Sequence, residues 1–333
     1  MEVRPSFNPR PEGGRTRLLT ALRVRDYHAG MTVSPGDHIS VCICTFKRPA
    51  LLRRLLDRLK DQRTEGLFNY SAVVVDNDAL GSGREAVQAA REGSPISIEY
   101  HIEPERSISL ARNRSVECAA GNMVAFIDDD EFPEDGWLVN HYRTLMSSEA
   151  SGVLGPVRAH FDGPAPVWLV KSGLLERREF ATGEKLADSR FTRTGNVLLR
   201  KSLFSHREDR FDPSFGRTGG GDAVFFKRMM EKGHVFIWCN EAVVFETVPP
   251  ERHVRSYYLK RAFTRGMTEA RDTPFLSFST LRSIAAVPLY GLFLPFARLA
   301  GSHVFMRYLV KECDHLSKVL AHAGIKLVKE RPY

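Results

Sequence analysis

Apolar and amphipathic segments alternate along the first part of this 333-residue chain. Short apolar runs rich in β-branched residues have the character of buried strands, and they lie at 39–45, 71–75, 96–101 and 123–127. The segments between them have helical character, at 49–59 with leucines at helical spacing, at 84–91 and at 107–120. Alternating strands and helices at this spacing predict an α/β fold, in which a mostly parallel sheet carries helices on both faces.

Polar side chains follow three of the predicted strands at the point where each strand ends. They are Thr45 to Arg48, Asp76 to Asp78, and Asp128 to Asp130. Ligands of open α/β sheets bind outside the carboxyl ends of the strands, so we expect these side chains to line one site.

The run Asp128 to Asp130 predicts a metal site. Three acids directly after a buried strand are costly without a cation. Oxygen ligands with no His or Cys nearby favour Mg²⁺ or Mn²⁺ on a diphosphate. Asp129 itself is expected to be solvated. The alternative is an acidic, solvated turn that merely begins a helix.

Glycine patterns typical of other nucleotide sites are missing. Neither G-x-G-x-x-G nor G-x-x-x-x-G-K-[ST] occurs in the chain, and residues 44–50 contain no glycine. This disfavours a dinucleotide site or a P-loop.

The excess of positive charge that gives the net charge of +8 lies in the carboxyl-terminal part of the chain. Residues 251–333 hold 14 basic and 6 acidic side chains, whereas residues 39–250 hold 28 and 30. Such an excess indicates either nucleic acid or an anionic membrane surface as a partner. The charge-free run 284–297, between Arg282 and Arg298, favours the membrane. It is too short to span a bilayer and contains two prolines, so we expect an interfacial or re-entrant segment, with a buried core helix as the alternative.

These features divide the chain into three parts. Residues 1–38 begin with a stretch rich in Arg, Pro and Gly and are expected to be a disordered leader. Residues 39–250 would form the ligand-binding domain, and 251–333 a basic helical extension that contacts the membrane or acts as a lid. The five cysteines show no metal-ligand spacing and are expected to be reduced. We therefore expect a cytoplasmic protein, peripheral on the cytosolic face of the plasma membrane.

Several segments carry motifs. Four of them lie in the first half: V-C-I-C-T-F-K-R-P (41–49), V-V-V-D-N-D (73–78), S-I-S-L-A-R-N-R-S-V-E-C-A-A-G (107–121) and F-I-D-D-D (126–130). Three more follow: T-G-N-V-L-L-R (194–200), F-G-R-T-G-G-G-D (215–222) and F-E-T-V-P-P-E-R (245–252). With these motifs the chain resembles the family-two inverting glycosyltransferases, whose nucleotide-sugar domain has the GT-A fold. The later motifs are most similar to those of bacterial exopolysaccharide members, including succinoglycan glucosyltransferases.

The resemblance implies a role for each matching position. The donor pocket would be lined by Thr45, Arg48, Asp76 on the uracil, Arg112 near the base or the diphosphate, and Asp128 on the ribose. Asp130, with Asp128, would bind the Mg²⁺ or Mn²⁺. Asp222 would be the catalytic base, and it stands alone because Gly221 replaces the Glu of many family members.

Simpler roles are open for three of these residues. Asp76 would then cap a turn, Arg112 would be a surface helix arginine, and Asp222 would be a helix N-cap. Glu246 would either reach the metal or form a salt bridge at the end of a strand.

The leading hypothesis is transfer of a hexose, glucose foremost, from a UDP-sugar to a lipid-linked saccharide. One carboxylate deprotonates the acceptor hydroxyl opposite the leaving diphosphate, so the anomeric centre inverts. The absence of Q-x-x-R-W, a motif of processive synthases, favours one sugar per binding event. The alternatives are a nucleotidyltransferase that makes a nucleotide-sugar and a non-catalytic nucleotide-sugar binding module. No nucleic-acid partner is expected.

Overall fold

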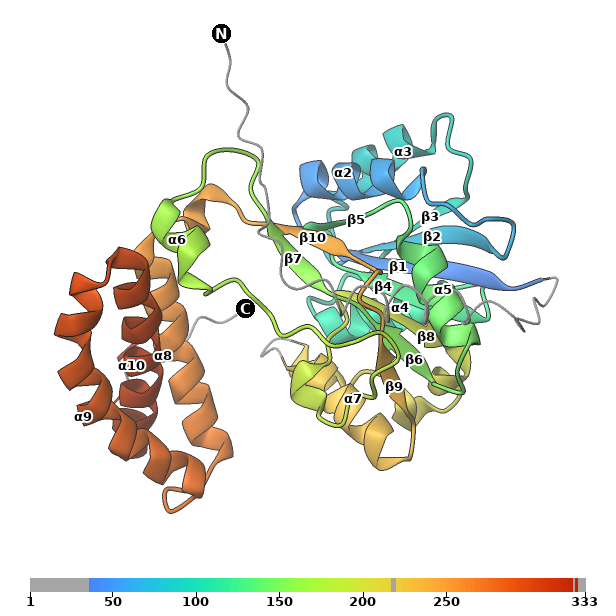
Figure 1. The fold of residues 1–333 in the computed structure, drawn as a ribbon. Coiled ribbons are helices and arrows are strands. Elements are labelled where there is room, and N and C mark those ends of the chain that lie inside the picture. The colour runs from blue at the N-terminus through green and yellow to red at the C-terminus, as the bar shows by residue number, and fades with distance from the viewer. Residues whose placement is uncertain (1–35, 217–219, 326, 329–333) are drawn as a thin grey trace, which may run out of the picture.

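Seven strands form the central sheet of the structure, a computed structural model that describes residues 36–216, 220–325 and 327–328. The strand order is β3 (Ile98–Ile102), β2 (Asn69–Asp76), β1 (His38–Thr45), β4 (Met123–Ile127), β8 (Asn196–Arg200), β6 (Gly152–Leu154) and β9 (Phe236–Trp238). Neighbouring strands run parallel, except that β8 is antiparallel to both β4 and β6 (Figure 1). The predicted strands are β1 to β4, so the mostly parallel α/β sheet is confirmed.

Helices cover both faces of this sheet. On one face lie α2 (Pro49–Leu59), α3 (Arg84–Arg91) and α5 (Trp137–Met146), and on the other lie α4 (Ile108–Cys118) and α7 (Gly221–Glu231). Alternate residues of a strand point to opposite faces, so Val41 and Ile43 pack in the core under α2, whereas Cys42 packs in the core under α4. Of the leader predicted for residues 1–38, residues 1–35 lie outside the described part of the chain. Residues 217–219 of the F-G-R-T-G-G-G-D motif also lie outside it.

A second, three-stranded sheet begins directly after the acidic run. Its order is β5 (Glu131–Pro133), β10 (Val244–Thr247) and β7 (Val157–His160), with β10 antiparallel to β5 and parallel to β7. The register pairs Glu246 with Glu131, which brings two carboxylates from distant parts of the chain together beside the end of β4. The remaining short elements are α6 (Val167–Ser172) and 3₁₀ helices at Ser189–Phe191, Lys201–Phe204, Arg207–Asp209, Pro213–Phe215 and Pro250–Arg252.

Asn196, the first residue of β8, is fully buried and connects this strand to α5 and to two loops. Its Oδ1 accepts hydrogen bonds from Trp137 Nε1 and His141 Nε2, each at 2.7 Å. Its Nδ2 donates to the carbonyl oxygens of Pro156 at 2.9 Å and Ala242 at 2.7 Å. Burial lowers the pKa of His141 to about 4, which keeps the imidazole neutral and suited to this network. The side chain thereby holds the start of β8 against α5 and against the loops before β7 and β10.

The last three helices pack into a unit of their own beside the sheets (Figure 1). They are α8 (Arg255–Asp272), α9 (Phe278–Leu299) and α10 (Ser302–His322), and side chains of α8 and α10 share a small core with Leu169 of α6. The described residues of the basic extension predicted for 251–333 thus form helices.

The prediction for 284–297 is wrong in its length. The run belongs to the 22-residue α9, which continues through Pro288 and Pro295. Both prolines lie on the exposed side of the helix, where water can reach the carbonyl groups that lose a partner. By length and composition α9 is long enough to cross a membrane, with a mean hydropathy of 1.3, and only 17% of that stretch is buried. It is therefore not the buried core helix of the alternative.

Candidate active site

The predicted site residues come from five elements at one edge of the central sheet. Thr45 and Asp76 end β1 and β2, and Asp128 to Asp130 follow β4. Arg112 lies on α4 and Asp222 in the first turn of α7. Because β1, β2 and β4 are parallel, their carboxyl ends meet at this edge, as the sequence predicts.

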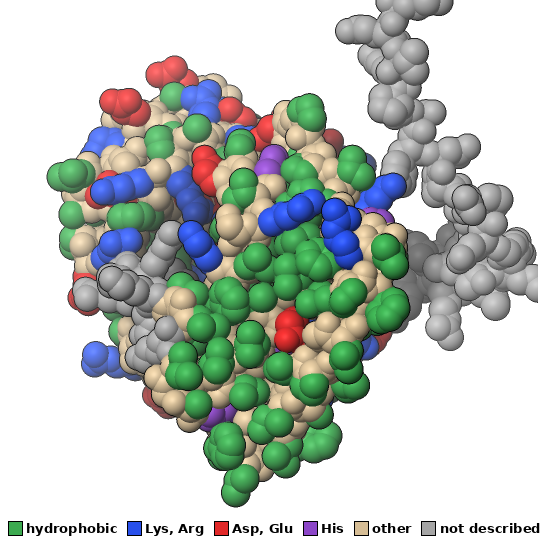
Figure 2. Space-filling model, turned by 90° about the vertical axis from the view of Figure 1, so that its left-hand side faces the viewer, with side chains coloured by type: hydrophobic (Ala, Val, Ile, Leu, Met, Phe, Trp, Pro, Cys, Tyr) green, Lys and Arg blue, Asp and Glu red, His purple; other side chains and the backbone are tan. Residues whose placement is uncertain are grey.

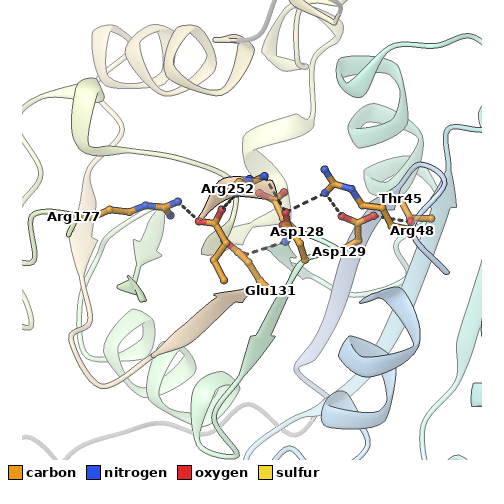
Figure 3. A network of polar contacts seen from close by, with 9 residues as sticks. Thr45, Arg48, Asp128, Asp129, Glu131, Arg177 and Arg252 are labelled. Carbon is orange, nitrogen blue, oxygen red and sulfur yellow. Dashed lines mark hydrogen bonds and ion pairs between the residues drawn. The ribbon is translucent and has the colours of Figure 1, made fainter. Parts of the chain in front are cut away.

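Asp129 is the anchor of the loop after β4. Its Oδ2 accepts a hydrogen bond from Thr45 Oγ1 at 2.8 Å, and its Oδ1 lies 3.0 Å from an Arg48 guanidinium nitrogen (Figure 3). The same nitrogen donates to Asp130 Oδ2 at 3.1 Å. The expectation that Asp129 is solvated is wrong, because the residue is only 5% exposed and both of its oxygens are engaged. Thr45 and Arg48 thus hold the acidic loop against β1, and their contact with a nucleotide stays a prediction.

Asp128 lies close to several charged side chains. Burial raises the pKa of Asp128 to about 6, and the charges of Asp130, Asp129 and Asp222 act in the same direction. The positive charge of Arg112 opposes this shift. Arg112 and Asp222, which are 110 residues apart in the chain, therefore both lie near Asp128. Arg112 also stacks over Phe211 at 5.6 Å, so it is not a free surface arginine.

Glu131 and Gly195 form a close contact next to Asp128. Glu131 is 3% exposed and its Oε2 accepts a hydrogen bond from the Asp128 backbone N–H at 3.2 Å. A Cβ on Gly195 would lie 2.7 Å from Glu131 Oε1 and 3.1 Å from Asp128 Oδ2. Only glycine leaves room for both carboxylates here, which explains its place before Asn196. Burial and the neighbouring acids raise the pKa of Glu131 well above its usual range.

In the view of Figure 3, Arg177 lies on the side of the acidic cluster away from Arg48, with Arg252 between them. Glu246 accepts from Arg252 at 2.8 Å and pairs with Arg177 (Figure 3). Burial, followed by the charge of Arg177, lowers the pKa of Arg193, while Glu131, Asp222 and Glu246 counteract the shift. Arg193 thus lies among these carboxylates. The salt bridge at the end of a strand, one of two expectations for Glu246, is what the structure contains.

Asp222 lies in the first turn of α7, whose N-cap is Gly220 with a φ of +84°. The N-cap alternative for Asp222 is therefore wrong by two positions. A left-handed N-cap of this kind favours glycine, and a carboxylate in the first turn is stabilised by the helix dipole. Apart from the backbone N–H of Ala223 at 3.0 Å, no hydrogen-bond donor to Asp222 is found among the described residues. Among the described residues, the half-buried side chain is thus held only by its own helix.

Asp76 organises the loop that follows β2. The side chain has no exposed surface, and its oxygens accept hydrogen bonds from the backbone N–H groups of Asp78 at 3.0 Å and Gly83 at 2.6 Å, and from Tyr100 Oη at 2.8 Å. This is the turn-capping role that was the alternative. The predicted hydrogen bond to a uracil stays a prediction.

The donor set suits a hard divalent cation that is shared with a phosphate. In the described part of the chain, no three side chains among Asp, Glu, His and Cys converge closely enough to hold a metal alone. Mg²⁺ and its analogues are commonly held by one or two carboxylates, with substrate phosphates and water completing the shell. The partly buried carboxylates of Asp128 and Asp130 fit that arrangement, and burial together with nearby carboxylates raises the pKa of both. They are the residues predicted for the metal.

Several residues of the site were not found from the sequence. Glu131 was attributed to a helix start, and Arg177 and Arg193 were not singled out. Arg193 directly precedes the T-G-N motif, which was its one local signal. Arg177 lies in irregular chain without a motif, so only the fold brings it to Glu246.

Comparison with known proteins identifies the family. Residues 40–207 match the model for glycosyl transferase family 2, which is half of the chain. The chain belongs to glycosyl transferase family 2. It is 36% identical over 239 residues to the succinoglycan biosynthesis protein ExoM of Rhizobium meliloti (strain 1021), covering 70% of this chain and 74% of that protein. The predicted family and the predicted glycosyltransferase activity are confirmed, and nucleotidyl transfer is disfavoured.

Solved structures share the fold of this glycosyltransferase. One is the mannosyltransferase PcManGT from Pyrobaculum calidifontis in complex with GDP-Man and Mn²⁺, with a TM-score of 0.58, 18% identity, and coverage of 92% of this chain and 93% of that chain. Another is S. aureus TarS 1-349 in complex with UDP-GlcNAc, with a TM-score of 0.50, 14% identity, and coverage of 86% and 91%. At these identities the likeness shows the GT-A fold, which was the predicted fold class.

Proposed function

We propose that this glycosyltransferase moves a hexose, glucose foremost, from a UDP-sugar to a lipid-linked saccharide, with inversion at the anomeric carbon. The observation that carries the proposal is the proximity of Asp222 to the acidic cluster after β4. A base beside a metal–diphosphate site is the arrangement that single displacement requires. The similarity to ExoM supports exopolysaccharide assembly as the process.

The donor would bind across the carboxyl ends of β1, β2 and β4. Arg48, whose side chain is 45% exposed, faces solvent beside Asp130 and can reach a diphosphate. Bound GDP-Man with Mn²⁺ in PcManGT and UDP-GlcNAc in TarS support a nucleotide-sugar and a divalent cation as ligands of this fold. Our preference for uracil and glucose rests on the motif resemblance.

Different residues would bind the metal, accept the proton and balance the charge of the site. Asp128 and Asp130 would hold the Mg²⁺ or Mn²⁺, which would stabilise the negative charge on the leaving diphosphate. Asp222 would accept the proton of the attacking acceptor hydroxyl. Arg193 and Arg177 place positive charge beside Glu131 and Glu246, which offsets the repulsion within the acidic cluster.

The acceptor and the cellular location complete the proposal. A lipid-linked acceptor would bring the enzyme to the cytosolic face of the plasma membrane, and the excess of basic residues in 251–333 supports an anionic surface there. All five cysteines are free, which agrees with a reducing compartment.

Release of nucleotide tests the proposed reaction. With UDP-glucose, Mn²⁺ and a membrane extract that supplies lipid-linked saccharide, we expect free UDP and no pyrophosphate, together with a glycosidic bond of inverted configuration. Product analysis by chromatography and NMR measures both. Pyrophosphate as the product, or retained configuration, would contradict the proposal.

A further inference from the structure

The helix α9 has its polar side toward the protein and its apolar side outward. Thr280 is fully buried and Ser283 is 2% exposed, and their hydroxyls lie 3.2 Å from His322 Nε2 and 3.0 Å from His315 Nδ1, both on α10. Farther along, Tyr290 stacks on His315, with ring centroids 5.7 Å apart. A helix on a water-soluble surface normally has the reverse polarity.

The outward side of α9 is a continuous apolar face. Large hydrophobic side chains recur every three or four residues, apart from one longer step between Leu281 and Leu289, and they are between 50% and 86% exposed: Phe278, Leu281, Leu289, Leu292, Phe296 and Leu299. Figure 2 looks at this side of the molecule, where hydrophobic side chains spread over the C-terminal helices and are interrupted by an acidic side chain. A patch of this kind marks an interaction site, because water is a poor solvent for it.

The charges around this face indicate its partner. The only charged residues of α9 are Arg282 and Arg298, both exposed, and residues 251–333 carry 14 basic and 6 acidic side chains. Lys and Arg side chains gather along the upper margin of the apolar surface in Figure 2. Arginines at such a margin can extend to phosphate headgroups while the apolar side chains enter the acyl region.

The packing of α9 decides how it meets a bilayer. It lies lengthwise against α10, from the Thr280–His322 contact to the Phe293–Tyr308 ring contact at 4.7 Å. α10 in turn forms ion pairs with α8, Arg265 with Asp314 and Lys318 with Glu269. If α9 crossed the membrane, α10 and these charges would enter the hydrocarbon, where charged groups are costly.

We propose that α9 inserts in the plane of an anionic lipid surface, with its apolar face in the acyl region of one leaflet and with α8 and α10 on the aqueous side. This inference deepens the proposed membrane location by naming the surface that contacts lipid. Its readout is lipid binding alone, so it can fail while the proposed sugar transfer stands, and the reverse also holds.

Vesicle flotation of the purified full chain tests the inference. We expect the protein to float with vesicles of phosphatidylcholine and phosphatidylglycerol, and much less with phosphatidylcholine alone. Leu292→Asp, at a side chain that is 74% exposed, should weaken binding by at least about tenfold, because it places a charge in the acyl region. The matched control is Leu80→Asp, at an 88% exposed leucine in the loop after β2, which should bind as the wild type does.

Three outcomes would overturn the inference. One is that the wild-type protein does not float with either vesicle. Another is that both variants lose binding equally. The third is that light scattering finds a dimer that Leu292→Asp dissociates, which would assign the face to a second copy of the chain. The comparison requires that the wild-type protein and both variants unfold at the same thermal midpoint. We expect this result because both leucines are exposed.

Discussion

Asp222→Asn is expected to lower the rate of sugar transfer by on the order of 1,000-fold while donor binding is retained. The amide keeps the size of the side chain and can still accept the hydrogen bond from the Ala223 backbone N–H. It cannot take the proton of the acceptor hydroxyl, so the loss should lie in turnover. UDP release with UDP-glucose, Mn²⁺ and lipid-linked saccharide measures the rate, and thermal unfolding with UDP and Mn²⁺ measures donor binding.

The control for this variant lies on the same helix. Glu231→Gln changes a carboxylate to an amide at the last residue of α7, where the side chain is 65% exposed and pairs only loosely with Lys227 at 3.9 Å. It should retain full activity. If Asp222→Asn turned over as fast as Glu231→Gln, Asp222 would not be the base.

Asn196→Ala is expected to lower the free energy of unfolding by about 3–5 kcal/mol. Alanine removes four hydrogen bonds at a fully buried position, and it leaves the indole N–H of Trp137 and the carbonyl groups of Pro156 and Ala242 without their partner. Urea unfolding followed by tryptophan fluorescence measures the change. An equal slope with urea in both proteins would show that the comparison is sound.

An exposed asparagine provides the control for this variant. Asn69→Ala, at the exposed start of β2, should change the free energy of unfolding by less than about 0.5 kcal/mol. A loss below about 1 kcal/mol in Asn196→Ala would mean that water or a rearranged side chain replaces the network. The functional consequence is local, because Asn196 directly follows Gly195, the residue that leaves room for Glu131 and Asp128.

The sequence predicted those parts of the fold and site that depend on neighbouring residues. Strands β1 to β4 and helices α2 to α4 could be predicted because each has its own apolar pattern. The position of Asp128 to Asp130 followed from β4, since a parallel strand delivers the next residues to the ligand-binding edge. The family motifs then supplied roles that the pattern alone does not contain.

The parts that were missed depend on contacts between distant segments. Asp129 is buried because Thr45 and Arg48, more than 80 residues earlier, reach its two oxygens. Glu131 meets Glu246 only through the register of β5 and β10. The length of α9 was underestimated because the charge-free run was delimited by Arg282 and Arg298, whereas the helix includes both arginines.

Thermal unfolding with UDP, in the presence and absence of Mn²⁺, tests the central claim of a metal-bridged diphosphate site. A ligand that binds only the folded protein stabilises it by about 2.7 kcal/mol at 100 times its dissociation constant, so a clear rise in the midpoint is expected. The rise should require both UDP and Mn²⁺, disappear in Asp130→Ala, and persist in the control Asp61→Ala, at an exposed acid beyond α2. No rise with any nucleoside diphosphate and metal, or a rise that Asp130→Ala leaves unchanged, would contradict the claim.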